Sequence, residues 1–232
     1  MQLTLSDDWT GEFRVAAQKR RADGEPDWSM GARLHPAVVR SVQRFQVGEA
    51  GDGANLIRAA ARAGDEEYAA AVRMFVAEEQ NHARLLASLL TAAGAPTITG
   101  HWTDAVFIAL RRALGLRLEL MVLLIAEVIA LRYYRALRDG TPDPLTRTVA
   151  ARILADEERH VPFHCRRLRQ GFRTMPRFAR RVIWGLWRLL HFGATVVVAW
   201  DHGPALRRLA LRRRDFVRDA NRQFSNTLTE IG

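Results

Sequence analysis

One motif, Glu-x-x-His, occurs twice in this chain at matched spacing. Each copy follows a lone glutamate by 30 residues, and each of these glutamates lies in an apolar stretch with the periodicity of a helix. Residues three apart on a helix share a face, so each motif presents a carboxylate and an imidazole to the same point. The residues of this doubled pattern are Glu49, Glu79, His82, Glu127, Glu157 and His160.

The six residues lie on apolar helical stripes, where an ionised carboxylate is costly unless it is paired, protonated or bound to a metal. Four converging carboxylates would repel one another strongly without cations. The pattern therefore predicts a dinuclear metal centre within a four-helix bundle. We expect Glu79 and Glu157 to bridge the ions, Glu49 and Glu127 to be terminal or chelating ligands, and each histidine to bind one ion.

Carboxylate oxygens and imidazole nitrogens together suit iron or manganese. We therefore expect two iron ions as the cofactor, with an iron–manganese pair as the alternative. The competing interpretation is ordinary surface charge, because EEQNH (78–82) and DEERH (156–160) are also common polar helix sequences. The paired spacing and the apolar flanks argue against it.

Glycine and proline residues separate the stretches with helical periodicity. Gly64 fits the end of one helix and Asp65 the N-cap of the next. The helices we expect cover about residues 9–20, 35–63, 66–93, 102–138, 144–173, 182–200 and 204–227. The chain is accordingly divided into an N-terminal lead-in (1–34), the metal-binding bundle (35–173) and a basic, apolar helical extension packed on the bundle (174–232).

Two further residues are candidates for supporting the metal ligands. Asp52 lies one turn after Glu49 and offers an acceptor for a ligating imidazole, with simple solvent exposure as the alternative. His164 lies one turn after His160 on the same face, with a buried, hydrogen-bonded histidine as the alternative. Pro162 removes a backbone donor between them and is expected to kink its helix.

Three glycines, Gly48, Gly51 and Gly53, surround Glu49 in the first expected long helix. Glycine inside a helix lowers stability by about 0.5–1 kcal/mol relative to alanine, so a cluster of three indicates a structural or functional requirement. One reason is room for oxygen or substrate beside the metals. The other is close helix packing or a true break in the helix, and the sequence leaves both open.

Neighbours of the ligands are not expected to take part in the chemistry. Glu78 and Glu158 fall off the ligand stripes and are expected on the surface. Tyr133 and Tyr134, near Glu127, are expected in the core.

Composition excludes some classes of protein. The single cysteine, Cys165, rules out a disulfide framework and an in-chain rubredoxin-type iron site, which needs paired cysteines. The polar, acidic N-terminus carries no sign of a signal peptide, so we expect a cytoplasmic protein. The net charge is +10, yet residues 166–232 hold 15 basic and only 4 acidic residues. The whole positive excess therefore lies in the C-terminal part.

The run 182–200 is strongly apolar and nearly long enough to span a bilayer. Arg188 and His191 interrupt it, which argues against a full span. We expect this helix to pack on the bundle or in a homodimer interface. A peripheral membrane contact through 177–214 is the second interpretation, because tryptophans and flanking arginines suit an interfacial segment. Nucleic acid is disfavoured, since the basic extension contains no recognised nucleic-acid motif.

The ligand pattern resembles the ferritin-like di-iron carboxylate superfamily, which includes ferritins, rubrerythrins, aldehyde-deformylating oxygenases, tRNA hydroxylases and demethoxyubiquinone hydroxylases. The resemblance covers 35–173 and rests on Glu49, EEQNH (78–82), Glu127 and DEERH (156–160). It implies an all-α, ferritin-like four-helix bundle, here with additional C-terminal helices. It also implies a di-iron or iron–manganese centre and chemistry with oxygen or peroxide.

Within that superfamily we expect a non-haem di-iron oxygenase or oxidase. It would use dioxygen and an external electron donor to oxidise a small organic substrate, and the apolar extension suggests that this substrate is hydrophobic. Rubrerythrin-like peroxide reduction and iron binding or storage without an organic substrate remain the alternatives.

Overall fold

The computed structural model describes residues 8–102 and 115–232, and every regular element in these ranges is a helix. This confirms the all-α expectation. The elements are α1 (Trp9–Ala22), the short 3-10 helix η1 (Trp28–Met30), α2 (Pro36–Glu49), α3 (Ala54–Arg62), α4 (Glu66–Ala92), α6 (Gly115–Gly140), α7 (Pro144–Phe172), α8 (Arg177–Asp201), α9 (Gly203–Arg208) and α10 (Arg213–Ile231).

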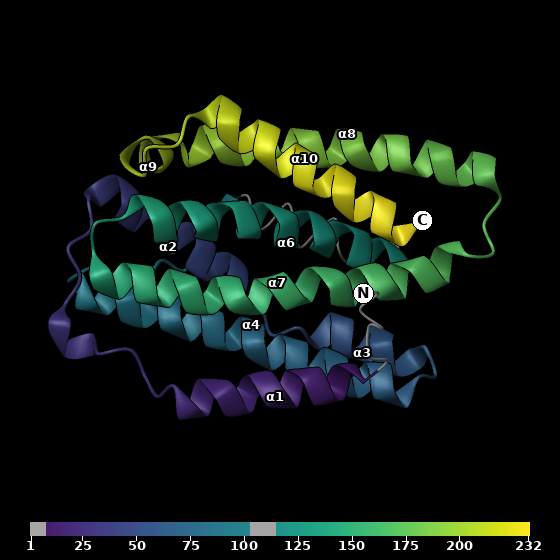
Figure 1. Ribbon diagram of the computed structural model, residues 1–232, viewed down its shortest axis with the longest axis horizontal. Coiled ribbons are helices and arrows are strands. Elements are labelled where there is room, and N and C mark those ends of the chain that lie inside the picture. Colours follow the sequence, from purple (N-terminus) through teal and green to yellow (C-terminus); the bar gives the residue numbers. More distant parts are fainter. Residues whose placement is uncertain (1–7, 103–114) are drawn as a thin grey trace, which may run out of the picture.

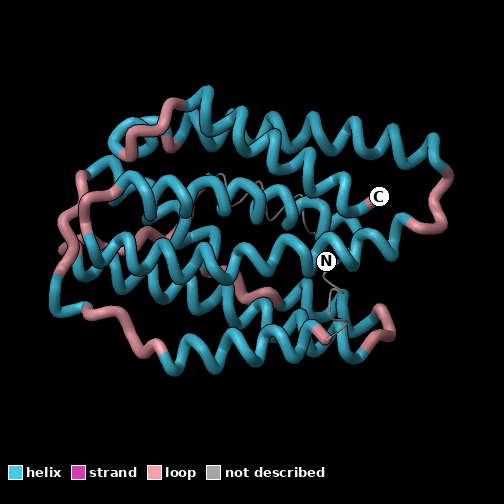
Figure 2. Tube along the Cα trace, in the orientation of Figure 1, coloured by secondary structure: helices cyan, strands magenta, loops and turns pink. Residues whose placement is uncertain are grey.

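The helices form layers that run roughly along the long axis of the molecule (Figure 1). In the bundle, α2 packs on α4, α4 on α7, α7 on α6, and α3 on both α4 and α6. At one side α1 covers α4, and at the other side α10 covers α6 and α7 and in turn carries α8. The trace in Figure 2 shows the loops that join these helices. The bundle core is therefore covered by further helices on two sides.

Side-chain caps begin the two longest helices, and the cap of the first was expected from the sequence. Asp65 accepts a hydrogen bond from the Tyr68 backbone N–H at the start of α4 (2.9 Å). Asp143 does the same for Thr146 at the start of α7 (2.8 Å). Such caps satisfy backbone donors that a helix leaves free at its first turn. They fix where the two helices that carry the Glu-x-x-His motifs begin.

The helix expected over 35–63 is in fact two helices, because α2 ends at Glu49 and α3 begins at Ala54. Gly53, between them, has φ +61°, and a Cβ atom there would lie 2.5 Å from the side chain of Val76. Only glycine accepts both this conformation and this close approach to α4. The break was one of the two explanations for the glycine cluster, and it makes Glu49 the last residue of α2.

Two other expected helices are split or lie partly outside the described ranges. The C-terminal helix expected over 204–227 is split into α9 and α10, with Ala210 between them at φ 55°. Helix α7 agrees with the helix expected over 144–173, since it runs from Pro144 to Phe172 and contains Pro162. The first part of the helix expected over 102–138 falls on residues 103–114, outside the described residues.

Candidate metal centre

The bundle brings all six residues of the doubled motif to one place. Helix α2 supplies one glutamate, α6 supplies another, and α4 and α7 each supply a glutamate and a histidine. Five of the six side chains are buried, and the sixth, Glu79, is 19% exposed. Residues separated by up to about half of the chain therefore converge because four helices pack side by side, as expected for this kind of bundle.

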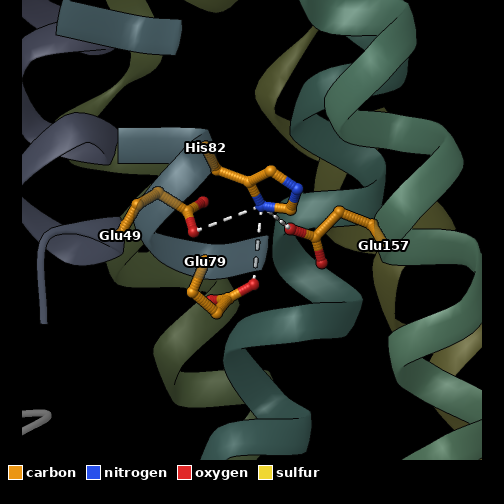
Figure 3. A group of neighbouring side chains, drawn as sticks. All are labelled: Glu49, Glu79, His82 and Glu157. Carbon is orange, nitrogen blue, oxygen red and sulfur yellow. Dashed lines mark ion pairs between the residues drawn. The ribbon is translucent and has the colours of Figure 1, made fainter. Parts of the chain in front are cut away.

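The donor atoms form two overlapping groups, in each of which all atoms lie within 4.8 Å of one another. The first group, drawn in Figure 3, consists of Glu49, Glu79, His82 and Glu157. The second consists of Glu79, Glu127, Glu157 and His160. Glu79 and Glu157 belong to both groups. Each group offers three carboxylates and one imidazole, the kind of oxygen and nitrogen set that suits iron or manganese.

The Nδ1 atoms of both histidines point into the carboxylates. His82 Nδ1 lies 3.4 Å from Glu157 Oε1 and 3.5 Å from Glu79 Oε1. His160 Nδ1 lies 3.2 Å from Glu79 Oε1 and 3.4 Å from Glu127 Oε2. Among the described residues, several buried oxygen and nitrogen atoms that could bind a metal here have no hydrogen-bond partner. These atoms are Glu79 Oε1, His82 Nδ1, Glu127 Oε2, Glu157 Oε2 and His160 Nδ1.

Buried polar atoms are normally hydrogen-bonded, so a convergent set without partners needs an explanation. Burial, followed by the charge of Glu79, raises the pKa of Glu49 to about 8. Burial, followed by the charges of Glu157 and Glu79, raises the pKa of Glu127 well above its usual range. The residues therefore fit a pair of cations, which would coordinate these atoms and neutralise the excess negative charge.

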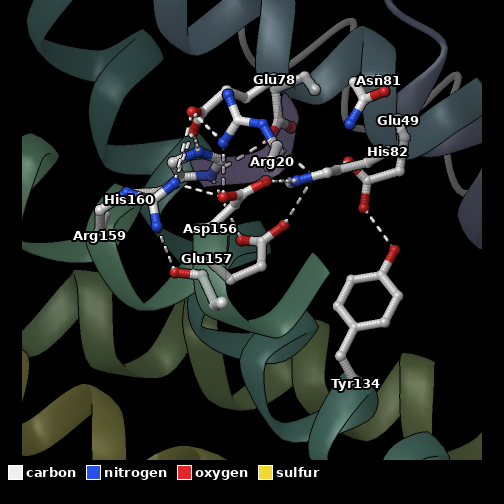
Figure 4. Close-up of polar contacts among 12 residues, drawn as sticks. Arg20, Glu49, Glu78, Asn81, His82, Tyr134, Asp156, Glu157, Arg159 and His160 are labelled. Carbon is white, nitrogen blue, oxygen red and sulfur yellow. Dashed lines mark hydrogen bonds and ion pairs between the residues drawn. The ribbon is translucent and has the colours of Figure 1, made fainter. Parts of the chain in front are cut away.

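The other nitrogen of each imidazole is held by an acid from the opposite motif (Figure 4). His82 Nε2 donates to Asp156 Oδ2 (3.2 Å), and His160 Nε2 donates to Glu78 Oε2 (3.0 Å). Each acid directly precedes the glutamate of its own motif and reaches across to the other helix. Such a carboxylate fixes the tautomer and the orientation of a metal-ligating histidine. Here it keeps Nδ1 directed at the other carboxylates.

Two arginines join these acids into one buried network. Arg20 Nη1, on α1, lies 2.6 Å from Glu78 Oε1 and 2.8 Å from Asp156 Oδ1. Arg159 Nη2 lies 3.3 Å from Glu78 Oε2 and also pairs with Asp156. The acids are nearly inaccessible to solvent, and these arginines offset the cost of burying their negative charge. Helix α1 thus takes part in holding the centre.

One expectation about neighbouring residues is wrong, and for a second residue the structure shows the alternative interpretation. Glu78 is buried and supports His160, whereas we expected it on the surface. Asp52 is exposed, and its side chain accepts a hydrogen bond from the Ala54 backbone N–H (3.0 Å) in the turn that precedes α3 instead of contacting an imidazole. The surface position of Glu158 is confirmed. The sequence did carry a signal for the real supporting acids, because both motifs have an acid directly before the glutamate.

His164 is fully buried, and its Nε2 lies 3.8 Å from Glu127 Oε1. Its ring packs edge-on against Phe75, with 4.7 Å between the ring centroids. His164 therefore lies where it can influence Glu127, and its supporting role stays a prediction.

A tyrosine also touches the centre. The Tyr134 hydroxyl donates a hydrogen bond to Glu49 Oε1 at 2.6 Å (Figure 4). Next to it, Tyr133 stacks on Phe45 and accepts a hydrogen bond from Ser41 Oγ (2.9 Å). Both tyrosines are buried, as expected of core residues. The contact between Tyr134 and Glu49 was not foreseen, because the doubled motif relates Glu127 of α6 to Glu49 but does not show which other side chains of α6 reach α2.

Comparison with known proteins agrees with this geometry. The model of the family described as P-aminobenzoate N-oxygenase AurF matches residues 56–222. Among solved structures, the chain is similar to an R2-like ligand-binding oxidase, a mutant with an aerobically reconstituted Mn/Fe cofactor. The TM-score is 0.66 and the sequence identity 14%, over 98% of this chain and 94% of the other. No curated protein sequence matches the chain.

These matches confirm the ferritin-like bundle and the resemblance to the di-iron superfamily. The family match also bears out the expectation of an oxygenase, a dioxygen-dependent oxidoreductase, and the two donor groups fit the expected dinuclear iron or iron–manganese cofactor. The identity of the individual ligands stays a prediction. Because the family model covers more than two thirds of its length, the chain belongs to the P-aminobenzoate N-oxygenase AurF family.

Proposed function

We propose that this protein oxidises an organic substrate with dioxygen at a dinuclear centre built from the doubled Glu-x-x-His motif. The observation that carries the proposal is the pair of overlapping donor groups that share Glu79 and Glu157. Two carboxylates common to two groups suit a pair of ions bridged by carboxylates. The proposed ligands are Glu49, Glu79, His82, Glu127, Glu157 and His160.

We propose the nitrogen of an aromatic amine as the atom that is oxidised. The support is the family match, since the name of that family describes N-oxygenation of p-aminobenzoate. The fold alone carries no such information, because one fold hosts many reactions. The broader proposal, a small hydrophobic organic substrate, does not depend on this choice.

The ions, when bound, supply the redox chemistry with dioxygen. The chain holds the ions in place and controls the access of substrate to them. Glu79 is the only one of the six ligands with appreciable exposure, so we propose that substrate approaches on its side. The ring of Phe75, which is itself buried, packs edge-on against the His160 ring at 4.7 Å between centroids. An apolar wall beside a partly open carboxylate suits a substrate that must displace water.

The test begins with the purified full-length protein, loaded with Fe(II) without oxygen and analysed for metal content. Dioxygen and peroxide are then added separately, and the absorbance is followed with and without p-aminobenzoate and a panel of hydrophobic aryl amines. Products are identified by mass spectrometry. The same series is run on Glu157→Gln, which removes one shared carboxylate, and on Glu158→Gln. The latter changes the adjacent acid, whose side chain is on the surface, and serves as the matched control.

We expect about two iron ions per chain, an oxygen-dependent absorbance change and an oxidised amine. Glu157→Gln should lose metal and activity, while Glu158→Gln should match the wild type. Rapid reaction with peroxide alone, without any organic product, would instead identify a rubrerythrin-like peroxide reductase. A shell-sized particle that accumulates iron would identify storage. Equal metal binding by both variants would refute the ligand assignment.

A further inference from the structure

Helix α8 is attached to the rest of the molecule along one side only. A stripe of residues at intervals of four, which includes Trp187 and His191, is buried against the neighbouring helices. The indole Nε1–H of Trp187 donates to the Met121 carbonyl on α6 (3.0 Å), and the His191 ring stacks on Phe224 of α10 at 4.0 Å. In Figure 1, α8 lies at the outer edge of the helical layers. Its other side is therefore left facing outwards.

That outward side is apolar. Of the twelve large hydrophobic residues that are exposed in the described part of the chain, nine lie on α8. Those on its outer face recur at intervals of three, four and seven, the spacing of one side of a helix. We call them the α8 strip, which consists of Phe178, Val182, Leu186, Leu189, Val196 and Trp200. Trp200, at one end, is 66% exposed and Phe178, at the other, 79%. At 1.5 Å per residue the strip is about 33 Å long.

A continuous apolar strip of this length marks a surface that binds something apolar. Isolated exposed hydrophobic residues are common on soluble proteins, but the strip is not scattered. The charges around it indicate what the partner is. Arg181 and Arg188 lie along one edge of the strip, and both are exposed. Beyond its C-terminal end the exposed arginines Arg207, Arg208 and Arg212 follow.

Within α8, the positive charges of Arg181 and Arg188 are not balanced by a carboxylate of the same helix, because the helix contains no acidic residue before Asp201. Asp201 itself pairs with Arg44, and Asp219 on the adjacent α10 pairs with Arg132. If two copies of the chain met through this face, arginine-lined edges would come together without acidic partners. A layer of anionic lipid headgroups would instead provide negative charge at the edges and hydrocarbon beneath the strip.

A helix that crossed the bilayer is a poorer solution, although α8 is long and apolar enough by composition. It would have to give up the buried contacts of Trp187 and His191, and it would place Arg188 in the hydrocarbon, which is costly. A helix lying in the interface keeps these contacts. Its arginine stems run along the apolar surface while their guanidinium groups reach the headgroups.

We propose that the α8 strip docks this protein on the surface of an anionic lipid bilayer, with α8 parallel to the membrane plane. The strip then sits at the boundary between headgroups and acyl chains, and the arginines contact lipid phosphates. The face binds lipid whether or not the metal centre turns over, so the docking does not depend on the proposed reaction.

The test is sedimentation of the full-length protein with vesicles of phosphatidylcholine alone and of phosphatidylcholine mixed with phosphatidylserine, at low and high salt. Tryptophan fluorescence is recorded in parallel, because Trp200 should enter a less polar environment. The apolar variant is Leu186→Gln with Leu189→Gln. Its matched control is Val15→Gln, an equally exposed apolar residue on α1. The charge variant is Arg181→Gln with Arg188→Gln, two exposed positions whose substitution leaves the core untouched.

We expect binding to the anionic vesicles that weakens with salt, with a blue shift of the tryptophan emission. The apolar variant should bind at least about tenfold more weakly, and the charge variant about fivefold more weakly for each arginine removed. Val15→Gln should bind like the wild type.

Three results would overturn the proposal. One is no binding to anionic vesicles at low salt. Another is unchanged binding by both the apolar and the charge variants. The third is a dimer on gel filtration that the apolar variant converts to a monomer while the wild type ignores vesicles, because the strip would then be an interface between copies. If the apolar variant fails to fold, the charge variant alone decides between the outcomes.

Discussion

Replacing Asp156 by asparagine should weaken one half of the metal centre while leaving the bundle intact. Asp156 is not among the proposed ligands, but its carboxylate accepts the hydrogen bond from His82 Nε2. It also pairs with Arg20 and Arg159. Asparagine has nearly the same size and can still accept one hydrogen bond, so the substitution removes the negative charge and little else.

The size of the effect follows from these contacts. Loss of a carboxylate that supports a metal-ligating histidine typically lowers metal affinity about 10- to 100-fold, which corresponds to about 1.4–2.7 kcal/mol. We expect the lower end, because asparagine retains an acceptor. Stability of the fold should fall by only about 1–3 kcal/mol, since Arg20 is partly exposed and keeps its contact with Glu78.

The measurement is an anaerobic titration with Mn(II) or Fe(II), analysed for two binding steps. The ion held by His82 should be weakened, while the ion held by His160, whose ring is supported by Glu78, should keep its affinity. Glu158→Gln changes the acid two positions along in the same motif and should titrate like the wild type. Wild-type affinities in Asp156→Asn, or equal losses in both variants, would refute the idea that the acids act by orienting the imidazoles.

Three further predictions concern other parts of the structure. Gly53→Ala should lower the free energy of unfolding by about 1–3 kcal/mol, because φ is +61° and the new Cβ meets Val76. Gly48→Ala, where a Cβ meets nothing, should be neutral or slightly stabilising in the same denaturant titration. Tyr134→Phe should weaken metal binding by about tenfold, because Glu49 loses its hydrogen-bond donor. Metal titration measures this affinity, and an unchanged value would show that the contact is only structural. Because burial raises the pKa of Glu49 to about 8, the metal-free native state binds more protons than the unfolded state up to that pH, so its melting temperature should fall from about pH 6.5 to about pH 8. Added metal should reverse this trend, and a melting temperature that rises over that interval without metal would contradict it.

Much of the centre could be predicted from sequence because helical periodicity is local information. The spacing of Glu79 and His82 places both on one face of α4 whatever that helix packs against. Caps such as Asp65 and turns such as the one before Pro144 are local as well, so the starts of α4 and α7 agree with expectation. The same local reasoning predicted long helices, four of which carry a carboxylate, or a carboxylate and an imidazole, on one apolar face.

Helical periodicity predicted the wrong exposure for a residue where a second face of a helix is covered. Glu78 lies about 100° around α4 from Glu79, a position that the apolar stripe assigns to the surface. In the structure α1 packs on that side of α4, and Arg20 from α1 meets Glu78 there. Helix α8 shows the same limit. Its apolar run predicts a helix that packs on the bundle or in a homodimer interface, and in the structure the stripe with Trp187 is covered while the remainder faces outwards.

The sequence by itself therefore determined the elements of this protein and the donors on one face of each helix: the doubled Glu-x-x-His motif, the helical class and the basic C-terminal part. Tertiary structure alone decided which faces meet. It paired His82 with Asp156 and His160 with Glu78 across α4 and α7, and it brought Tyr134 to Glu49. The physical reason is that side-chain spacing fixes directions within one helix, whereas contacts between helices depend on packing of the whole bundle.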